Sequence, residues 1–259
     1  MKKLIFVLLL VLLVSSCTSS KENTPPQTDG SASLTGKIAN SIELQMNMFV
    51  GNIKSVNKEK ALITKYNIDI TEYTVYKVEV TENIDGFTPT GEIDVYWLGT
   101  NNEFVTRCGL EKNNSYVLYA EPWVYGDKTV YLLSQYTVSF PRIDAAGMVT
   151  LEESDGTLSD LGSKEEFIKE HYTEIENYKS VNENFFTPEN TLSRFIDIYK
   201  TVYEKNSDFS IYENERYSWT PDEKHIQATS DKSKEIYNAL TALQSDADIT
   251  IDKIKEILM

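Results

Sequence analysis

The sequence predicts an α+β protein, with a small antiparallel β-barrel at residues 37–151 and a C-terminal helical region at residues 160–259. Between Glu43 and Tyr136, short runs of β-branched and aromatic residues are separated by Gly, Pro, Asn and Asp, which is typical of an all-β meander or small barrel. Beyond Ser163 the apolar residues instead recur at three- and four-residue steps, which is the period of amphipathic helices.

Side chains in the barrel region alternate between two faces. Tyr76, Val78 and Val80 share one face of a strand, and Lys77 and Glu79 share the other. The next run repeats the alternation, at Ile93, Asp94, Val95, Tyr96 and Trp97. Because successive side chains of a strand point to opposite sides, each strand offers one apolar face to a core. This pattern favours antiparallel pairing, since buried parallel strands read as continuous apolar runs.

Two glycines mark expected irregularities in the strands. Tyr125-Gly126-Asp127-Lys128 separates two apolar runs and predicts a tight hairpin turn, with Gly126 at a positive φ. Gly51 stands inside the first long strand, where a glycine indicates either a bulge that bends the strand or a loose edge. Residues 148–151 predict a last short strand.

Start signals divide the helical region. Ser163 with Glu166 is a capping box that opens a helix through about Asn177. Thr187-Pro188 and Thr220-Pro221 each place a proline at a first helical position. A further helix and a final short helix are expected around Ile236, Leu240 and Leu243 and after Thr250. The apolar stripes of these helices can pack on each other or on one side of the barrel, or they can form a groove for a partner helix.

The N-terminus predicts export and a lipid anchor. Met1–Ser16 combines Lys2 and Lys3 with an apolar run and two serines, as in a secretory signal peptide. Val14-Ser15-Ser16-Cys17 resembles the lipobox of bacterial lipoproteins. This resemblance implies cleavage before Cys17, a diacylglyceryl group on its thiol, and a place on the extracytoplasmic face of the cell membrane. The alternative is an ordinary cleaved signal followed by an unmodified cysteine.

Residues 17–36 are rich in Ser, Thr, Pro and Asn and lack an apolar pattern, so they are expected to form a flexible tether. The chain has two cysteines, and if Cys17 carries lipid, Cys108 has no partner for a disulfide. Cys108 is then either a buried small apolar residue or a free thiol.

Several stretches of the barrel region resemble a known domain family. They are Phe49-Val50-Gly51-Asn52-Ile53, Tyr76–Val80, and Arg107-Cys108-Gly109-Leu110 followed by Asn114–Ala120. Together they resemble the netrin-like domain, which is shared by tissue inhibitors of metalloproteinases and some bacterial surface proteins. The resemblance implies an OB-type five-stranded barrel over residues 43–140. The inhibitory mechanism of those proteins requires a free N-terminal cysteine, whereas Cys17 is expected to be acylated and to precede a tether, so that mechanism is not implied here.

The charge and the polar motifs limit the classes of function. A net charge of −15 in 259 residues disfavours nucleic-acid binding, because an acidic surface repels phosphates. The two histidines, His171 and His225, occur in unrelated contexts and lack the spacing of a zinc motif. The sequence contains no nucleophile elbow, phosphate loop or dinucleotide fingerprint. We therefore expect no catalytic residues, no metal site and no cofactor, and we predict that the protein is not an enzyme.

We predict a binding role at the cell envelope, with a protein, a peptide or a glycan as the partner. Most aromatic residues of the strands are expected in the core. Trp123 and Tyr125, beside a proline and a turn, are expected to be exposed and, together with Trp97, to contact a ligand. The alternatives are a solute-binding lipoprotein of a transporter, a cell-wall hydrolase, and a protease inhibitor that uses an unrelated loop.

Overall fold

The computed structural model describes residues 47–61, 71–86, 88–98, 109–133, 140–152, 156–207 and 222–258. These residues belong to one compact unit, Lys37–Met259. The predicted signal peptide, Cys17, the tether and Cys108 lie outside the described residues. No helix in the described part of the chain is long and apolar enough to cross a membrane.

The described residues form eight strands and four helices, so the α+β class is confirmed. The strands form one mixed sheet in the order β1-β2-β3-β5-β4-β6-β7-β8. Their bounds are β1 (Asn47–Ala61), β2 (Thr71–Asp85), β3 (Gly91–Leu98), β4 (Ser115–Tyr125), β5 (Lys128–Leu133), β6 (Arg142–Ile143), β7 (Met148–Glu152) and β8 (Leu158–Ser163). The helices are α3 (Lys164–Val181), α4 (Pro188–Asn206), α5 (Glu223–Leu243) and α6 (Ile251–Leu258).

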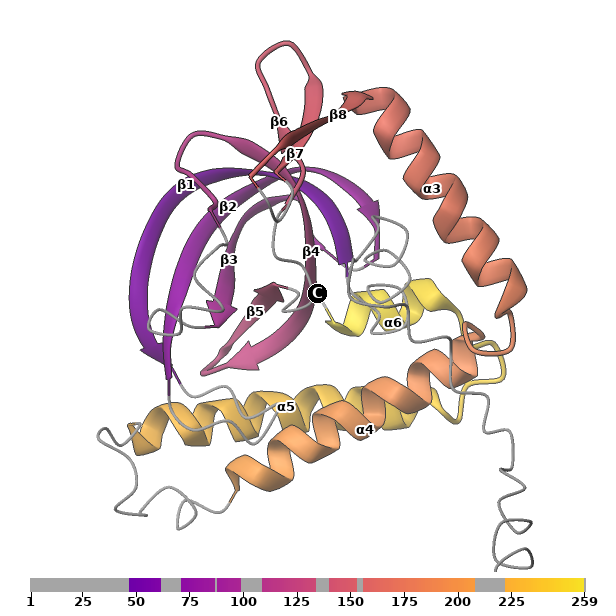
Figure 1. Ribbon diagram of the computed structural model, residues 1–259. Coiled ribbons are helices and arrows are strands. Elements are labelled where there is room, and N and C mark those ends of the chain that lie inside the picture. The colour runs from indigo at the N-terminus through magenta and orange to yellow at the C-terminus, as the bar shows by residue number, and fades with distance from the viewer. Residues whose placement is uncertain are drawn as a thin grey trace, which may run out of the picture. The chain divides into compact units, whose positions relative to one another are not determined.

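Five of the strands close into a ring (Figure 1). β1 pairs with β2 along its length and also with β4 through residues 47–52, which links the two ends of the order β1-β2-β3-β5-β4. The prediction of a purely antiparallel arrangement is wrong for one pair, because β3 and β5 run parallel. A closed ring with an odd number of strands cannot have every neighbour antiparallel, so ring closure itself requires one parallel pair.

The long strand β1 serves two partners because it bends. Its pairing with β2 shifts register between Val50 and Gly51, so the predicted bulge at this glycine is confirmed. A Cβ atom at Gly51 would overlap the side chain of Val78 and lie 3.2 Å from Leu118 Cδ1. Residue 51 must therefore be glycine, because β2 and β4 both approach β1 closely at this position. The pairing of β1 with both strands is also what closes the ring.

The hairpin between β4 and β5 is also confirmed. Gly126 has a φ of 66° in its turn. Its backbone N–H donates to Thr229 Oγ1 of α5 at 2.8 Å, and its Cα faces the ring of His225. The tip of this hairpin is therefore attached to a helix about a hundred residues away in the sequence.

The sheet continues past residue 151, where β7 pairs with β8 before the helices begin. The capping box at Ser163 and Glu166 is confirmed, and the helix that it opens runs to Val181 rather than to Asn177. Thr187 caps α4 as expected. The predicted start signal at Thr220 and Pro221 lies outside the described residues. The expectation of a separate further helix around Ile236 is wrong, since the single helix α5 runs from its cap at Asp222 through Leu243.

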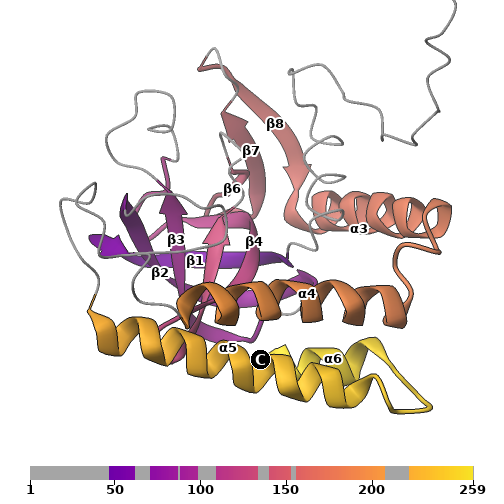
Figure 2. The ribbon, with the colours of Figure 1, turned by 90° about the horizontal axis from the view of Figure 1, so that it is seen from below.

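The helices α4 and α5 lie side by side along one side of the ring (Figures 1 and 2). Their apolar stripes pack on each other, on α6 and on Val124 of β4, as one of the sequence interpretations predicts. A second cluster joins the ring to α4, and it consists of Tyr73, Val75, Tyr96, Trp123, Tyr125, Val130, Leu132 and Val202. The in–out alternation of β3 predicted that Tyr96 faces solvent. Tyr96 is instead buried, because its side of the sheet packs against α4.

Candidate functional site

The three aromatic residues expected to contact a ligand are core residues. Trp97, Trp123 and Tyr125 are all buried, so the expected exposure of Trp123 and Tyr125 is wrong. Trp97 packs edge-on against Phe140, with ring centroids 6.2 Å apart. Burial raises the pKa of the Tyr125 phenol to about 12. These side chains contribute to packing in this structure rather than to a binding surface.

The helices α4 and α5 contribute to the burial of Trp123 and Tyr125. The ring of His225, on α5, lies against that of Tyr125 with centroids 4.0 Å apart. Val202, on α4, belongs to the same cluster as Trp123. The short connection of the β4–β5 hairpin suggested solvent exposure, but residues from distant helices cover it.

The histidines do not meet in a metal site. His171 is buried on α3, whereas His225 packs on the β4–β5 hairpin, and no group of three potential metal ligands occurs in the described ranges. His171 Nδ1–H donates to the carbonyl of Phe167 at 2.9 Å. Its Nε2 is buried without a hydrogen-bond partner among the described residues. Burial lowers the pKa of His171 to about 4, because protonation would place an unpaired N–H and a charge in the core.

The surface of α3 next to β2 contains a hollow of about 390 Å³. Its volume falls in the range of small-ligand sites. The capping box at Ser163 fixes the start of α3, so the lining side chains come from its first three turns and from the end of β2. The hollow is lined by Glu82, Lys164, Glu165, Ile168, Lys169, Tyr172 and Thr173.

Tyr172 is the aromatic residue in the lining of this hollow. It is 49% exposed, although the same helix buries Phe167, His171 and Ile175. Ile168, half-buried beside it, supplies a second apolar side chain. An exposed aromatic ring with charged neighbours of both signs can stack on a ligand and donate or accept hydrogen bonds around it.

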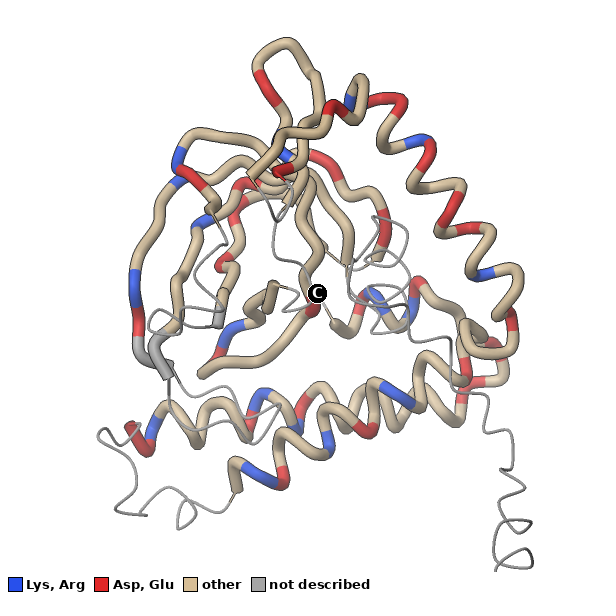
Figure 3. The backbone as a smooth tube through the Cα atoms, in the orientation of Figure 1, with Lys and Arg blue, Asp and Glu red and all other residues tan. Residues whose placement is uncertain are grey.

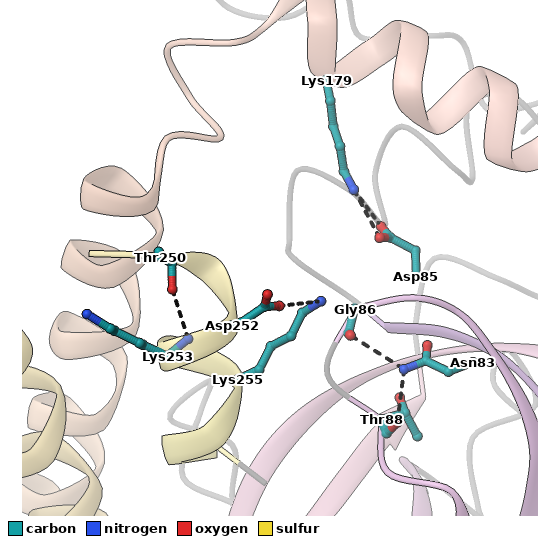
Figure 4. Close-up of polar contacts among 9 residues, drawn as sticks. All are labelled: Asn83, Asp85, Gly86, Thr88, Lys179, Thr250, Asp252, Lys253 and Lys255. Carbon is teal, nitrogen blue, oxygen red and sulfur yellow. Dashed lines mark hydrogen bonds and ion pairs between the residues drawn. The ribbon is translucent and has the colours of Figure 1, made fainter. Parts of the chain in front are cut away.

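Two ion pairs between α3 and the end of β2 position the hollow. Lys164 Nζ lies 2.8 Å from Glu82 Oε2. Lys179 Nζ lies 2.9 Å from Asp85 Oδ1, as Figure 4 shows. Both pairs are partly solvent-exposed, so each contributes about 0.2–1 kcal/mol. Their main effect is therefore to orient α3 along the strand.

The loop that follows β2 is braced from within. The side-chain amide of Asn83 donates to the carbonyl of Thr88 at 3.0 Å and to that of Gly86 at 3.5 Å (Figure 4). This bracing fixes the end of β2, and with it the carboxylates that receive the two lysines of α3.

Acidic residues outnumber basic residues along α3 (Figure 3). Glu165, Glu166, Glu170 and Glu176 are exposed on this helix. Desolvation and the neighbouring Glu170 raise the pKa of Glu174 above its ordinary value. Lys169 is exposed at the hollow and has no ion-pair partner in the described part of the chain, so it is a cation available to a ligand.

Sequence reasoning missed this hollow. Tyr172 falls outside the stripe of Phe167, His171 and Ile175, which was visible from helical spacing and could have identified it as an exposed aromatic residue. The position of Glu82 opposite this face depends on packing between a strand and a helix about eighty residues apart, and no local pattern encodes it.

Comparisons of this chain with protein-family models, with curated proteins and with solved structures found no match. The geometry of the hollow and the N-terminal sequence are therefore the basis for a functional proposal.

Proposed function

We propose that this protein is a lipid-anchored cell-envelope protein that binds a peptide or glycan segment in the hollow between α3 and β2. The observation that carries the binding role is the exposed Tyr172 ring in a hollow of about 390 Å³ with free Lys169 beside it. The anchor rests on the lipobox-like Val14-Ser15-Ser16-Cys17.

We further propose that the five-stranded ring is an OB-like barrel, as the netrin-like resemblance implies. Closure of β1-β2-β3-β5-β4 through the β1–β4 pairing supports this reading, since OB folds are five-stranded Greek-key barrels. OB folds bind ligands on the β2–β3 face. Here Tyr73, Val75 and Tyr96 of these strands are buried in the cluster that includes Val202 of α4, which favours a ligand site elsewhere, on α3.

Replacement of Cys17 by serine is expected to abolish lipid attachment. The variant should lose incorporation of labelled palmitate and leave the membrane fraction, because serine has no thiol to carry diacylglycerol. Buried acyl chains contribute about 0.8 kcal/mol per CH₂, and two chains suffice for stable anchoring. Replacement of Cys108 by serine is the control and should keep both properties. Palmitate incorporation that persists in the Cys17→Ser protein would contradict the anchor.

Replacement of Tyr172 by alanine is expected to weaken ligand binding about five- to thirtyfold, since loss of an aromatic anchor costs about 1–2 kcal/mol. The probe is a set of soluble peptidoglycan fragments, which contain both glycan and peptide, titrated calorimetrically into the full chain in detergent. Fragments with the peptide removed distinguish the two ligand chemistries.

Lysine variants provide a matched pair for the same titration. Lys169→Glu changes the charge at the hollow, whereas Lys200→Glu makes the same change at an exposed site on α4. Only Lys169→Glu is expected to change the affinity for the peptidoglycan fragments. Undiminished binding by Tyr172→Ala and Lys169→Glu, or absence of binding to every fragment by the folded wild type, would refute the proposed site.

A further inference from the structure

The turn between α3 and α4 presents two apolar side chains to solvent. Val181, the last residue of α3, is 83% exposed, and Phe185 in the turn is 41% exposed. Val181 is the most exposed large apolar side chain in the part of the chain that the structure describes. We refer to Val181 and Phe185 as the corner patch. It shares no residue with the hollow that Tyr172 lines.

The backbone of this turn is held in place by hydrogen bonds. The N–H of Asn182 donates to the carbonyl of Tyr178 at 3.1 Å, and that of Phe185 donates to the carbonyl of Asn182 at 2.8 Å. From α4, Arg194 Nη2 donates to the carbonyl of Phe185 at 2.9 Å. These bonds tie the turn to both of the helices that flank it.

The side chain of Phe185 is fixed as well. The guanidinium carbon of Arg194 lies 3.8 Å from the centroid of its ring, and the ring of Phe186 packs edge-on at 5.0 Å. An exposed aromatic ring that is already immobilised loses little conformational entropy when a partner covers it. Preorganised aromatic residues are typical of the side chains that dominate protein–protein affinity.

Glu183, which lies between the two residues of the corner patch in the sequence, follows the C-cap residue of α3. A carboxylate near the C-terminus of a helix is unfavourable, because the carbonyl end of the helix carries partial negative charge. Glu183 therefore places a negative charge beside the carbonyl end of α3, although the last turn of the helix carries the favourable cation Lys179.

The charges around the corner patch select the partner. Glu183 and Glu189 are both exposed, and neither forms an ion pair within the described residues. Arg194 lies beneath the Phe185 ring, and desolvation lowers its pKa. The free carboxylates repel anionic lipid headgroups and attract Lys or Arg side chains.

We propose that the corner patch docks into a partner protein that presents an apolar pocket rimmed by Lys or Arg. Phe185 and Val181 fill the pocket, and Glu183 and Glu189 face its basic rim. This interaction is separate from ligand binding at Tyr172 and does not depend on it.

Selection from a random phage-displayed peptide library against the full chain in detergent tests the proposal. The selected peptides are expected to combine apolar residues with Lys or Arg. Surface plasmon resonance should show their affinity falling at least tenfold for Phe185→Ala and for Val181→Asp. Glu183→Lys should also weaken binding, because it removes an attractive charge and adds a repulsive one.

The matched control is Leu158→Asp, which changes an apolar side chain that is 71% exposed on β8 and should leave affinity unchanged. If Phe185→Ala unfolds the turn, the Val181→Asp protein still tests the proposal. Circular dichroism verifies that the Val181→Asp protein is folded. Acidic consensus peptides, no enrichment, or equal loss with Leu158→Asp would overturn the proposal. Two further results would overturn it: self-association of the protein in light scattering that Val181→Asp abolishes, or binding to phosphatidylglycerol vesicles that Val181→Asp abolishes.

Discussion

Replacement of Gly51 by alanine is expected to lower the free energy of unfolding by about 3 kcal/mol. The added Cβ would overlap Val78 and crowd Leu118, and both of these side chains are fully buried. Overpacking of a core normally costs about 1–3 kcal/mol, and this site is at the upper end because β1 pairs there with both β2 and β4. Urea unfolding followed by circular dichroism measures the change.

Gly109 provides the matched control for this substitution. A Cβ at Gly109 meets nothing within 4 Å, so Gly109→Ala should change stability by less than about 0.5 kcal/mol. Equal stability of the Gly51→Ala and Gly109→Ala proteins would contradict the close packing of three strands at the bulge.

Acidification is expected to destabilise the protein through His171. Its pKa is about 4 in the folded state, against 6.5 for the free side chain, so the unfolded chain binds the proton more readily. The stability loss begins as the pH falls below 6.5, grows down to about pH 4, and is then complete. The gap between the two pKa values corresponds to a loss of about 3 kcal/mol.

The His171→Phe protein isolates this contribution, since its carboxylates titrate as in the wild type. The difference in unfolding free energy between the two proteins should change by about 3 kcal/mol between pH 7 and pH 4, with the wild type losing more. Parallel pH profiles would contradict a buried neutral imidazole. So would an NMR titration that gives His171 an ordinary pKa.

Local patterns identified most of the elements in this fold. The capping box at Ser163 and Glu166 and the Thr187 cap placed two helices, and Gly126 placed the β4–β5 turn. Each of these signals involves residues only a few positions apart, so it can be recognised in the local sequence. The parallel pairing of β3 with β5 has no local signal, because it follows from closure of the whole ring.

Burial by distant elements explains the errors about the site. Trp123 and Tyr125 stand beside a turn, which suggested exposure, but α4 and α5 cover them. Tyr172 could have been predicted to be exposed from its place off the apolar stripe of α3. Its hollow could not, because Glu82 reaches it only through tertiary packing.

The mass of the mature N-terminal peptide decides whether Cys17 carries a lipid anchor. Protein purified from the membranes of its native cells is digested, and the peptide that contains Cys17 is analysed by mass spectrometry. We expect a chain that begins at Cys17 and carries diacylglycerol on its thiol, which would place the ligand hollow of α3 outside the cytoplasm. A mature chain with an unmodified Cys17, or one that retains Met1–Ser16, would contradict the proposed anchor and the envelope function that depends on it.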